Sequence, residues 1–233
     1  MNLSLVPAVL FLAIVYFSGS NKQVEPPKEV NETNKLTFRK DSDINFKSVE
    51  GVESEYQKNI NTIYDFITNK FTKIDKQDAQ QISKNLVDYG EKYKLDPKLA
   101  AAVIARESSF NKAAVSETGA KGLGQIKDFN FSDLSINDPF SIDQNVSGTV
   151  KYLKEMIKNW KEIPENGVTE ETENAIVEEE IDVKLGLASY FKGFTAVKNK
   201  GIDEKTQQYV DDIIDYYKEI IELEEKTNLK SEE

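Results

Sequence analysis

The sequence predicts a mostly α-helical protein. Three observations lead to this class: apolar residues recur at helical spacing in several segments, strand-like alternation is not sustained in any segment, and no internal repeat is present. A chain of 233 residues has room for one medium-sized domain and a targeting segment. We therefore expect a single α-helical domain preceded by a different kind of segment.

The first 20 residues have a composition of their own. Residues 3–17 are almost continuously apolar, and small residues follow at 18–20. The run is typical of a signal peptide and short for a bilayer span, but no Lys or Arg precedes it and no clear A-x-A pattern ends it. We predict a signal peptide or an N-terminal membrane anchor at 1–20, with a buried helix as the alternative. Prolines and scattered polar residues at 21–51 predict a flexible tether.

Residues 52–225 are predicted to form the domain. Helical spacing of apolar residues places helices at 56–71, 82–93, 145–160, 183–191 and from about 206 onward. Another helix should begin after Asp96, which can cap it, with Pro97 in the first turn. A charged tail is expected at 226–233.

An acidic segment interrupts this pattern at 162–182, with nine acidic residues and no basic one. Such a charge run predicts a solvated, mobile loop inserted in the domain. The alternative is a dedicated role, such as binding a basic protein partner or a cation, or restraining access to the functional site.

The composition excludes several kinds of chemistry. The chain has no His and no Cys, so a Ser-His-Asp triad, a Cys-His nucleophile, a disulfide and the usual zinc sites are ruled out, and we expect no metal and no cofactor. Acid–base chemistry near neutral pH must then come from a carboxylate, a lysine or a tyrosine. The net charge of −11 also disfavours a nucleic-acid partner.

Glu107 is the strongest candidate for that chemistry. On the helix after Pro97 it falls near the middle of the apolar face, which consists of Leu99, Ala100, Val103 and Ile104. Burial favours the protonated acid and raises its pKa, which suits a proton donor. The alternative is that Glu107 pairs with Arg106 or Lys112, and the spacing alone does not separate the two.

A glycine-rich segment follows at 116–125, with three glycines in six positions and Gln125 at its end. Glycines at this density let the backbone approach a ligand or another backbone closely, and a glutamine can both donate to and accept from an amide. An ordinary turn is the alternative interpretation.

Several motifs, in the same order along the chain, resemble those of the soluble lytic transglycosylase family. Residues 107–111 (ESSFN) and 115–125 (VSETGAKGLGQ) are similar to its E-S-x-F and S-x-x-G-A-x-G-L-M-Q motifs. Asn145, Gly148, Tyr152 and Leu153 are similar to its N-x-x-x-G-x-x-Y-L helix, with Gly148 one position nearer to Asn145 than in the motif. Residues 188–193 (ASYFKG) resemble A-x-Y-N-x-G, and 209–210 match a terminal Y-V. The resemblance spans roughly residues 80–217.

The resemblance implies a lysozyme-like domain with a sugar-binding cleft that cleaves peptidoglycan glycan strands. The bond would be the β-1,4 link between N-acetylmuramic acid and N-acetylglucosamine, leaving 1,6-anhydro ends. Glu107 would be the catalytic acid and base, and Tyr190 would orient it or stabilise the transition state. The implied substrate-binding residues are Ser108, which also supports the end of the catalytic helix, Ser116, Gln125 and Asn145. The location would be the cell envelope, either periplasmic or anchored to the inner membrane and facing the periplasm.

Two positions depart from the family motifs. Gly124 stands where the family has Met, from which we expect a wider subsite, and Phe191 stands where it has Asn, which removes an amide from the segment bearing Tyr190. Two alternatives remain: a non-catalytic peptidoglycan-binding or scaffolding module, and a hydrolysing lysozyme. A lysozyme would need a second carboxylate, for which Glu117, Asp128 and Asp133 are candidates.

Overall fold

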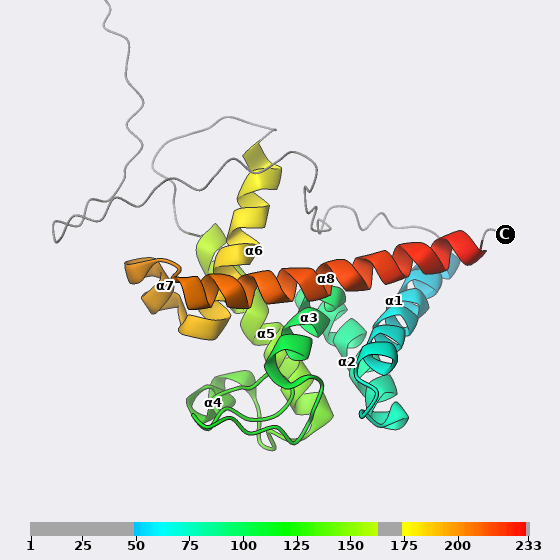
Figure 1. Ribbon diagram of the computed structural model, residues 1–233, viewed down its shortest axis with the longest axis horizontal. Helices are drawn as coiled ribbons and strands as arrows, with labels where there is room; N and C mark the ends of the chain where they lie inside the picture. Colours follow the sequence, from blue (N-terminus) through cyan, green and yellow to red (C-terminus); the bar gives the residue numbers. More distant parts are fainter. Residues whose placement is uncertain (1–48, 163–173, 232–233) are drawn as a thin grey trace, which may run out of the picture. The chain divides into compact units, whose positions relative to one another are not determined.

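The computed structural model describes residues 49–162 and 174–231, and helices dominate both ranges (Figure 1). In chain order these are α1 (Val49–Lys70), α2 (Lys76–Tyr93), α3 (Pro97–Ser108), the 3-10 turn η2 (Asp128–Asn130), α4 (Phe131–Leu134), α5 (Ile142–Lys161), α6 (Asn174–Lys192), α7 (Phe194–Lys200) and α8 (Glu204–Ser231). Over the same ranges β pairing is limited to isolated bridges from Lys121 to Val115 and Ile126. The mostly α prediction is confirmed.

Helix α3 is the central helix of the domain. It contacts α1, α2, α5 and α8, and Figure 1 shows the long helix α8 running across it. All residues from Lys98 to Ala105 are buried, including three consecutive alanines at 100–102. Small side chains let neighbouring helices approach closely, so α3 is enclosed on every side instead of presenting a single apolar face. As predicted, Asp96 caps the helix by accepting from the Lys98 amide at 2.8 Å, and Pro97 occupies the first turn.

The C-terminal half of α8 is anchored by charged residues. Lys98 is 1% exposed, and its Nζ donates to Asn59 Oδ1 at 2.5 Å and lies 3.5 Å from Glu224 Oε2. Lys58 Nζ lies 3.3 Å from the other oxygen of the buried Glu224. Since a buried charge is tolerated only with partners, these contacts fix α8 against α1 and α3.

Three predicted boundaries were wrong. Helix α8 continues to Ser231, so no separate charged tail begins at 226, because i,i+4 pairs such as Lys226–Glu222 support the helix there. Helix α6 begins at Asn174 and not at 183, so 174–182 are helical and not a loop. Helix α1 begins at Val49, before the expected end of the tether. The predictions for 1–48 and 163–173 lie outside the described residues.

The part of the chain that the structure describes contains no helix with the length and apolar character needed to cross a membrane. The apolar run at 3–17 lies outside that part.

Candidate active site

Glu107 lies in the last turn of α3, immediately before the chain leaves the helix. Ser109 and Phe110 both have positive φ, 50° and 61°, which ends the helix abruptly. The Phe110 side chain is 1% exposed and packs against Phe66 and Phe71 with ring centroids 6.2 and 5.1 Å apart. This buried aromatic cluster fixes the helix end, and with it the half-buried Glu107.

Tyr209 of α8 is the hydrogen-bond partner of Glu107. Its hydroxyl donates to Glu107 Oε1 at 2.5 Å, and the tyrosine is 2% exposed. A bond this short is typical of a donor facing a charged or strongly polar acceptor. The two residues are 102 positions apart in the sequence, and the packing of α8 on α3 brings them together.

Burial raises the pKa of Glu107 to about 7, while the hydrogen bond from Tyr209 and the nearby Arg106 charge act in the opposite direction. A carboxyl group in this range is protonated in a large share of molecules at neutral pH and can still lose its proton. It can therefore act first as an acid and then as a base.

The alternative in which Glu107 is a partner in a salt bridge does not fit the observed contacts. Arg106 Nε donates to Asp212 Oδ2 at 2.7 Å, and Lys112 Nζ donates to Asp78 Oδ1 at 2.7 Å. Both cations predicted as partners therefore pair with other carboxylates. Glu107 is half-buried at the end of α3, and its predicted catalytic role stays a prediction.

Tyr190 of α6 lies close to this site, but it does not make the contact expected of it. Its hydroxyl donates to the Gly124 carbonyl oxygen at 2.7 Å, and its ring packs on Tyr152 with centroids 5.0 Å apart. Burial raises its pKa well above the usual value, and the Glu107 charge adds to this effect. Glu107 thus receives its hydrogen bond from Tyr209, while Tyr190 binds the glycine-rich loop, and stabilisation of the transition state by Tyr190 stays a prediction.

Asn145 occupies a structural position, and its predicted contact with substrate stays a prediction. The side chain is 1% exposed, and its Oδ1 accepts from the Gly124 amide at 2.8 Å. Its Nδ2 donates to the carbonyl oxygens of Pro139 at 2.8 Å and Lys121 at 3.2 Å. Both the oxygen and the nitrogen of this buried amide are thus hydrogen-bonded to backbone groups of two loops.

Gly124 does not open a wider subsite, contrary to the sequence-based expectation. A Cβ built at this position would overlap the hydroxyl oxygen of Thr149 and lie 2.9 Å from the Tyr190 hydroxyl. Thr149 is fully buried on α5 and bonds back to the Asn145 carbonyl oxygen at 2.8 Å. The space next to Gly124 is therefore filled by these two hydroxyl groups.

The other predicted substrate-binding residues are partly used within the protein. The Ser116 hydroxyl accepts from the Ala120 amide at 3.0 Å, and Gln125 Nε2 donates to the Gly122 carbonyl oxygen at 2.9 Å. Ser108 Oγ donates to the Ile104 carbonyl oxygen at 3.3 Å, which supports the end of α3. All three are only half-buried, so contact of their remaining polar atoms with a ligand stays a prediction.

The three carboxylates considered as a second catalytic group all lie on the surface. Glu117 and Asp133 are exposed, and the exposed Asp128 pairs with Lys121 at 2.9 Å. Among the described residues, no group of three or more Asp or Glu side chains is arranged to hold a metal ion.

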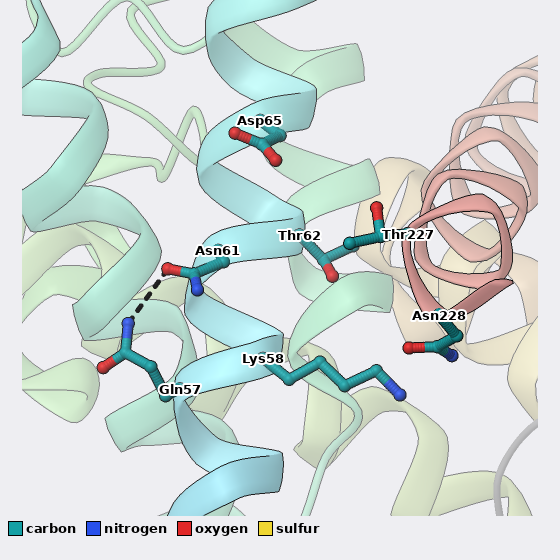
Figure 2. Close-up of a pocket in the computed structure, with 7 residues that line it drawn as sticks. All are labelled: Gln57, Lys58, Asn61, Thr62, Asp65, Thr227 and Asn228. Carbon is teal, nitrogen blue, oxygen red and sulfur yellow. Dashed lines mark hydrogen bonds between the residues drawn. The ribbon is translucent and has the colours of Figure 1, made fainter. Parts of the chain in front are cut away.

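A pocket of about 380 Å³ lies between α1 and the end of α8, well separated in sequence from the motifs (Figure 2). Its lining is polar and consists of Gln57, Lys58, Asn61, Thr62, Asp65, Thr227 and Asn228. None of the predicted site residues lines it. The sugar-binding cleft beside Glu107 therefore stays a prediction.

Sequence reasoning missed one functional residue, Tyr209. The Y-V match at 209–210 was the available signal, and the helical spacing of the apolar residues after it indicated that Tyr209 faces the domain interior. The sequence contained no sign that its hydroxyl would reach Glu107.

Comparison with known proteins identifies a family and related proteins. The family described as "Transglycosylase SLT domain" matches residues 85–213, more than half of the chain. A membrane-bound lytic murein transglycosylase F from Desulfosudis oleivorans is 28% identical over 131 residues, which are 53% of this chain and 26% of that protein. The matched part of the chain thus spans about a quarter of the relative's length.

Proposed function

Because this chain belongs to the transglycosylase SLT domain family, we propose that it is a peptidoglycan lytic transglycosylase with Glu107 as its catalytic acid and base. The observation that carries the proposal is the half-buried Glu107 carboxyl, with a pKa of about 7 and a hydrogen bond from Tyr209. A surface glutamate would be ionised at neutral pH and could not donate a proton to a leaving group.

The proposed reaction uses Glu107 twice. The protonated carboxyl first donates its proton to the oxygen of the β-1,4 bond between N-acetylmuramic acid and N-acetylglucosamine, and the bond from that oxygen to the muramoyl C1 breaks. The carboxylate then removes the proton from the muramoyl 6-hydroxyl, whose oxygen bonds to C1. The products are a 1,6-anhydromuramoyl end and a free N-acetylglucosamine end, and Glu107 is protonated again.

Tyr209 has a defined part in this cycle. Its hydrogen bond to Oε1 is strongest when Glu107 is a carboxylate, so it stabilises the charged form that exists between the two proton transfers. It also fixes the rotation of the carboxyl group, so that Oε2 is the oxygen left to face the substrate. Tyr190 acts indirectly, since it positions the Gly124 segment.

The exposed positions of Glu117, Asp128 and Asp133 favour a transglycosylase over a hydrolysing lysozyme. An enzyme that positions water for attack normally needs a second carboxylate across the scissile bond. A 6-hydroxyl nucleophile belongs to the substrate and needs only one protein carboxyl. The name of the relative further supports a place in the cell envelope, with peptidoglycan glycan strands as the partner.

The deciding test is product analysis with purified peptidoglycan and two matched variants. Glu107→Gln keeps the size and the acceptor for Tyr209 but cannot donate or accept a proton as required. We expect it to retain less than about 1% of activity, since losing the group that performs both proton transfers removes about 10²–10⁴-fold. Glu117→Gln makes the same change on the surface and should keep full activity.

Mass spectrometry of the soluble fragments separates the alternatives. Anhydro ends with the natural protein support the transglycosylase, and reducing ends would establish a lysozyme instead. If the natural protein releases no fragments but still sediments with peptidoglycan, it is a non-catalytic binding module. Activity of several per cent in Glu107→Gln would refute the role of that residue.

A further inference from the structure

Phe191 is an exposed aromatic residue beside the catalytic centre. It directly follows Tyr190 near the end of α6 and is 40% exposed, whereas Tyr190 is buried. Its ring stacks on the Tyr209 ring with centroids 4.6 Å apart and planes inclined by 19°. Tyr209 itself is 2% exposed, so Phe191 forms part of the cover over the residue that binds Glu107.

Cationic side chains complete the arrangement around these two rings. The Arg106 guanidinium lies 5.4 Å from the centroid of the Tyr209 ring and is itself held by Asp212. Lys205 Nζ lies 5.6 Å from the centroid of the Phe191 ring. Stacked rings and cations over ring faces both restrict how a ring can turn. The Tyr209 ring is thus in contact with side chains from α3 and α6 while its own backbone belongs to α8.

We propose that Phe191 is a positioning residue, which holds the Tyr209 ring so that its hydroxyl points at Glu107. The inference rests on the proposed function, because it assigns Phe191 a part in the same reaction. An asparagine, as in the family motif, has no ring to stack on Tyr209. In this chain Phe191 therefore affects Glu107 by holding the Tyr209 ring of α8.

A different role for an exposed ring would be direct contact with a sugar. The two roles differ in how they depend on Tyr209. A positioning residue has no effect once the Tyr209 hydroxyl is gone, whereas a sugar platform acts regardless of it. A double-mutant cycle with Phe191→Leu and Tyr209→Phe separates them, because leucine keeps the apolar volume and loses the flat ring.

We expect Phe191→Leu to lower kcat on peptidoglycan about threefold to tenfold, the factor that one aromatic pair contributes, with KM within about twofold. Phe191→Tyr keeps the ring and should restore kcat to within about twofold of the natural protein. In the Tyr209→Phe background, Phe191→Leu should change kcat less than about twofold. The matched control is Phe194→Leu, since Phe194 also contacts a ring, that of Trp160 at a tilt of 60°, and also has a cation, Lys198, over it.

A second measurement works without catalysis, so failure of this inference can be told apart from failure of the proposed function. The Glu107 carboxyl is titrated by carbon NMR in the natural protein and in the two single variants. The charged and titratable groups facing it are Tyr209 of α8, Arg106 of α3 and Tyr190 of α6. Because the Tyr209 hydrogen bond holds the Glu107 pKa down, Tyr209→Phe should raise it, and Phe191→Leu should raise it by a smaller amount.

Each of three results would overturn the inference. One is an equal loss of kcat from Phe191→Leu with and without the Tyr209 hydroxyl. Another is a Glu107 titration unchanged by Phe191→Leu but raised by Tyr209→Phe. An effect of Phe191→Leu on KM alone would identify the ring as a sugar contact and would also reject the positioning role.

Discussion

Replacing Glu107 with Gln should stabilise the protein in a manner that depends on pH. In the folded protein the pKa of Glu107 is raised from 4.5 to about 7. A carboxyl group whose pKa is raised by folding contributes its full stability at a pH below its pKa in the unfolded chain. This contribution is lost as the pH rises through its pKa in the folded protein. At about 1.4 kcal/mol for each pH unit, the loss of stability between pH 4.5 and 7 amounts to about 3 kcal/mol.

Glutamine does not ionise, so the variant avoids this loss. It keeps an oxygen that can accept from the Tyr209 hydroxyl, and no other carboxylate is changed. The advantage of Glu107→Gln over the natural protein should therefore be about 3 kcal/mol larger at pH 8 than at pH 4.5. For a domain of this size, that corresponds to roughly 6–12 °C in Tm.

The measurement is urea denaturation of both proteins at several pH values between 4.5 and 8, with Glu117→Gln as the control. The surface variant should show a difference from the natural protein that hardly changes with pH. A pH-independent difference for Glu107→Gln as well would refute the reasoning, since it would mean that burial does not penalise the charge of Glu107.

Two further predictions concern the glycine-rich loop. Asn145→Ala removes three hydrogen bonds to backbone groups and should lower the free energy of unfolding by about 3–4 kcal/mol. The control is Asn137→Ala on the surface, which should change the free energy of unfolding by less than about 0.5 kcal/mol. Equal effects of the two substitutions would contradict the role of Asn145 in holding the loop. Gly124→Ala should lower the free energy of unfolding by about 2–3 kcal/mol, because the added methyl group overlaps Thr149. Chemical denaturation should show a smaller loss when the same substitution is made in a Thr149→Ala background. An identical loss in both backgrounds would mean that the methyl group clashes with a different residue.

Most helices could be predicted, and Glu107 could be singled out as a candidate, because their signals are local. Helical spacing is visible within a dozen residues, and the cap at Asp96 needs only the next two positions. The burial of Glu107 followed from the same helix periodicity. A segment such as 174–182 is harder, because its acidic composition resembles a loop although glutamate is a good helix former.

Contacts between distant segments could not be predicted in this way. Spacing along the chain has no information about which residue of α8 reaches α3, so the bond from Tyr209 to Glu107 was missed. Asn145 shows a different limit of sequence motifs. A motif indicates that a position matters, but it does not say whether the side chain contacts a ligand or the protein's own backbone. Only the geometry shows that the Asn145 amide is fully used within the protein.

The hydrogen bonds that hold the glycine-rich loop also determine which of its residues can be substituted. Asn145 accepts a hydrogen bond from the Gly124 amide, and Tyr190 donates one to the Gly124 carbonyl oxygen, so both hold the loop by its main-chain atoms. These atoms are the same whatever side chains the loop displays at its exposed positions, such as Val115 and Glu117. Outward-facing residues can therefore be exchanged without shifting the loop relative to Glu107. Under the proposed function, diversifying those positions in a library is a way to alter glycan preference while the position of Glu107 stays constant.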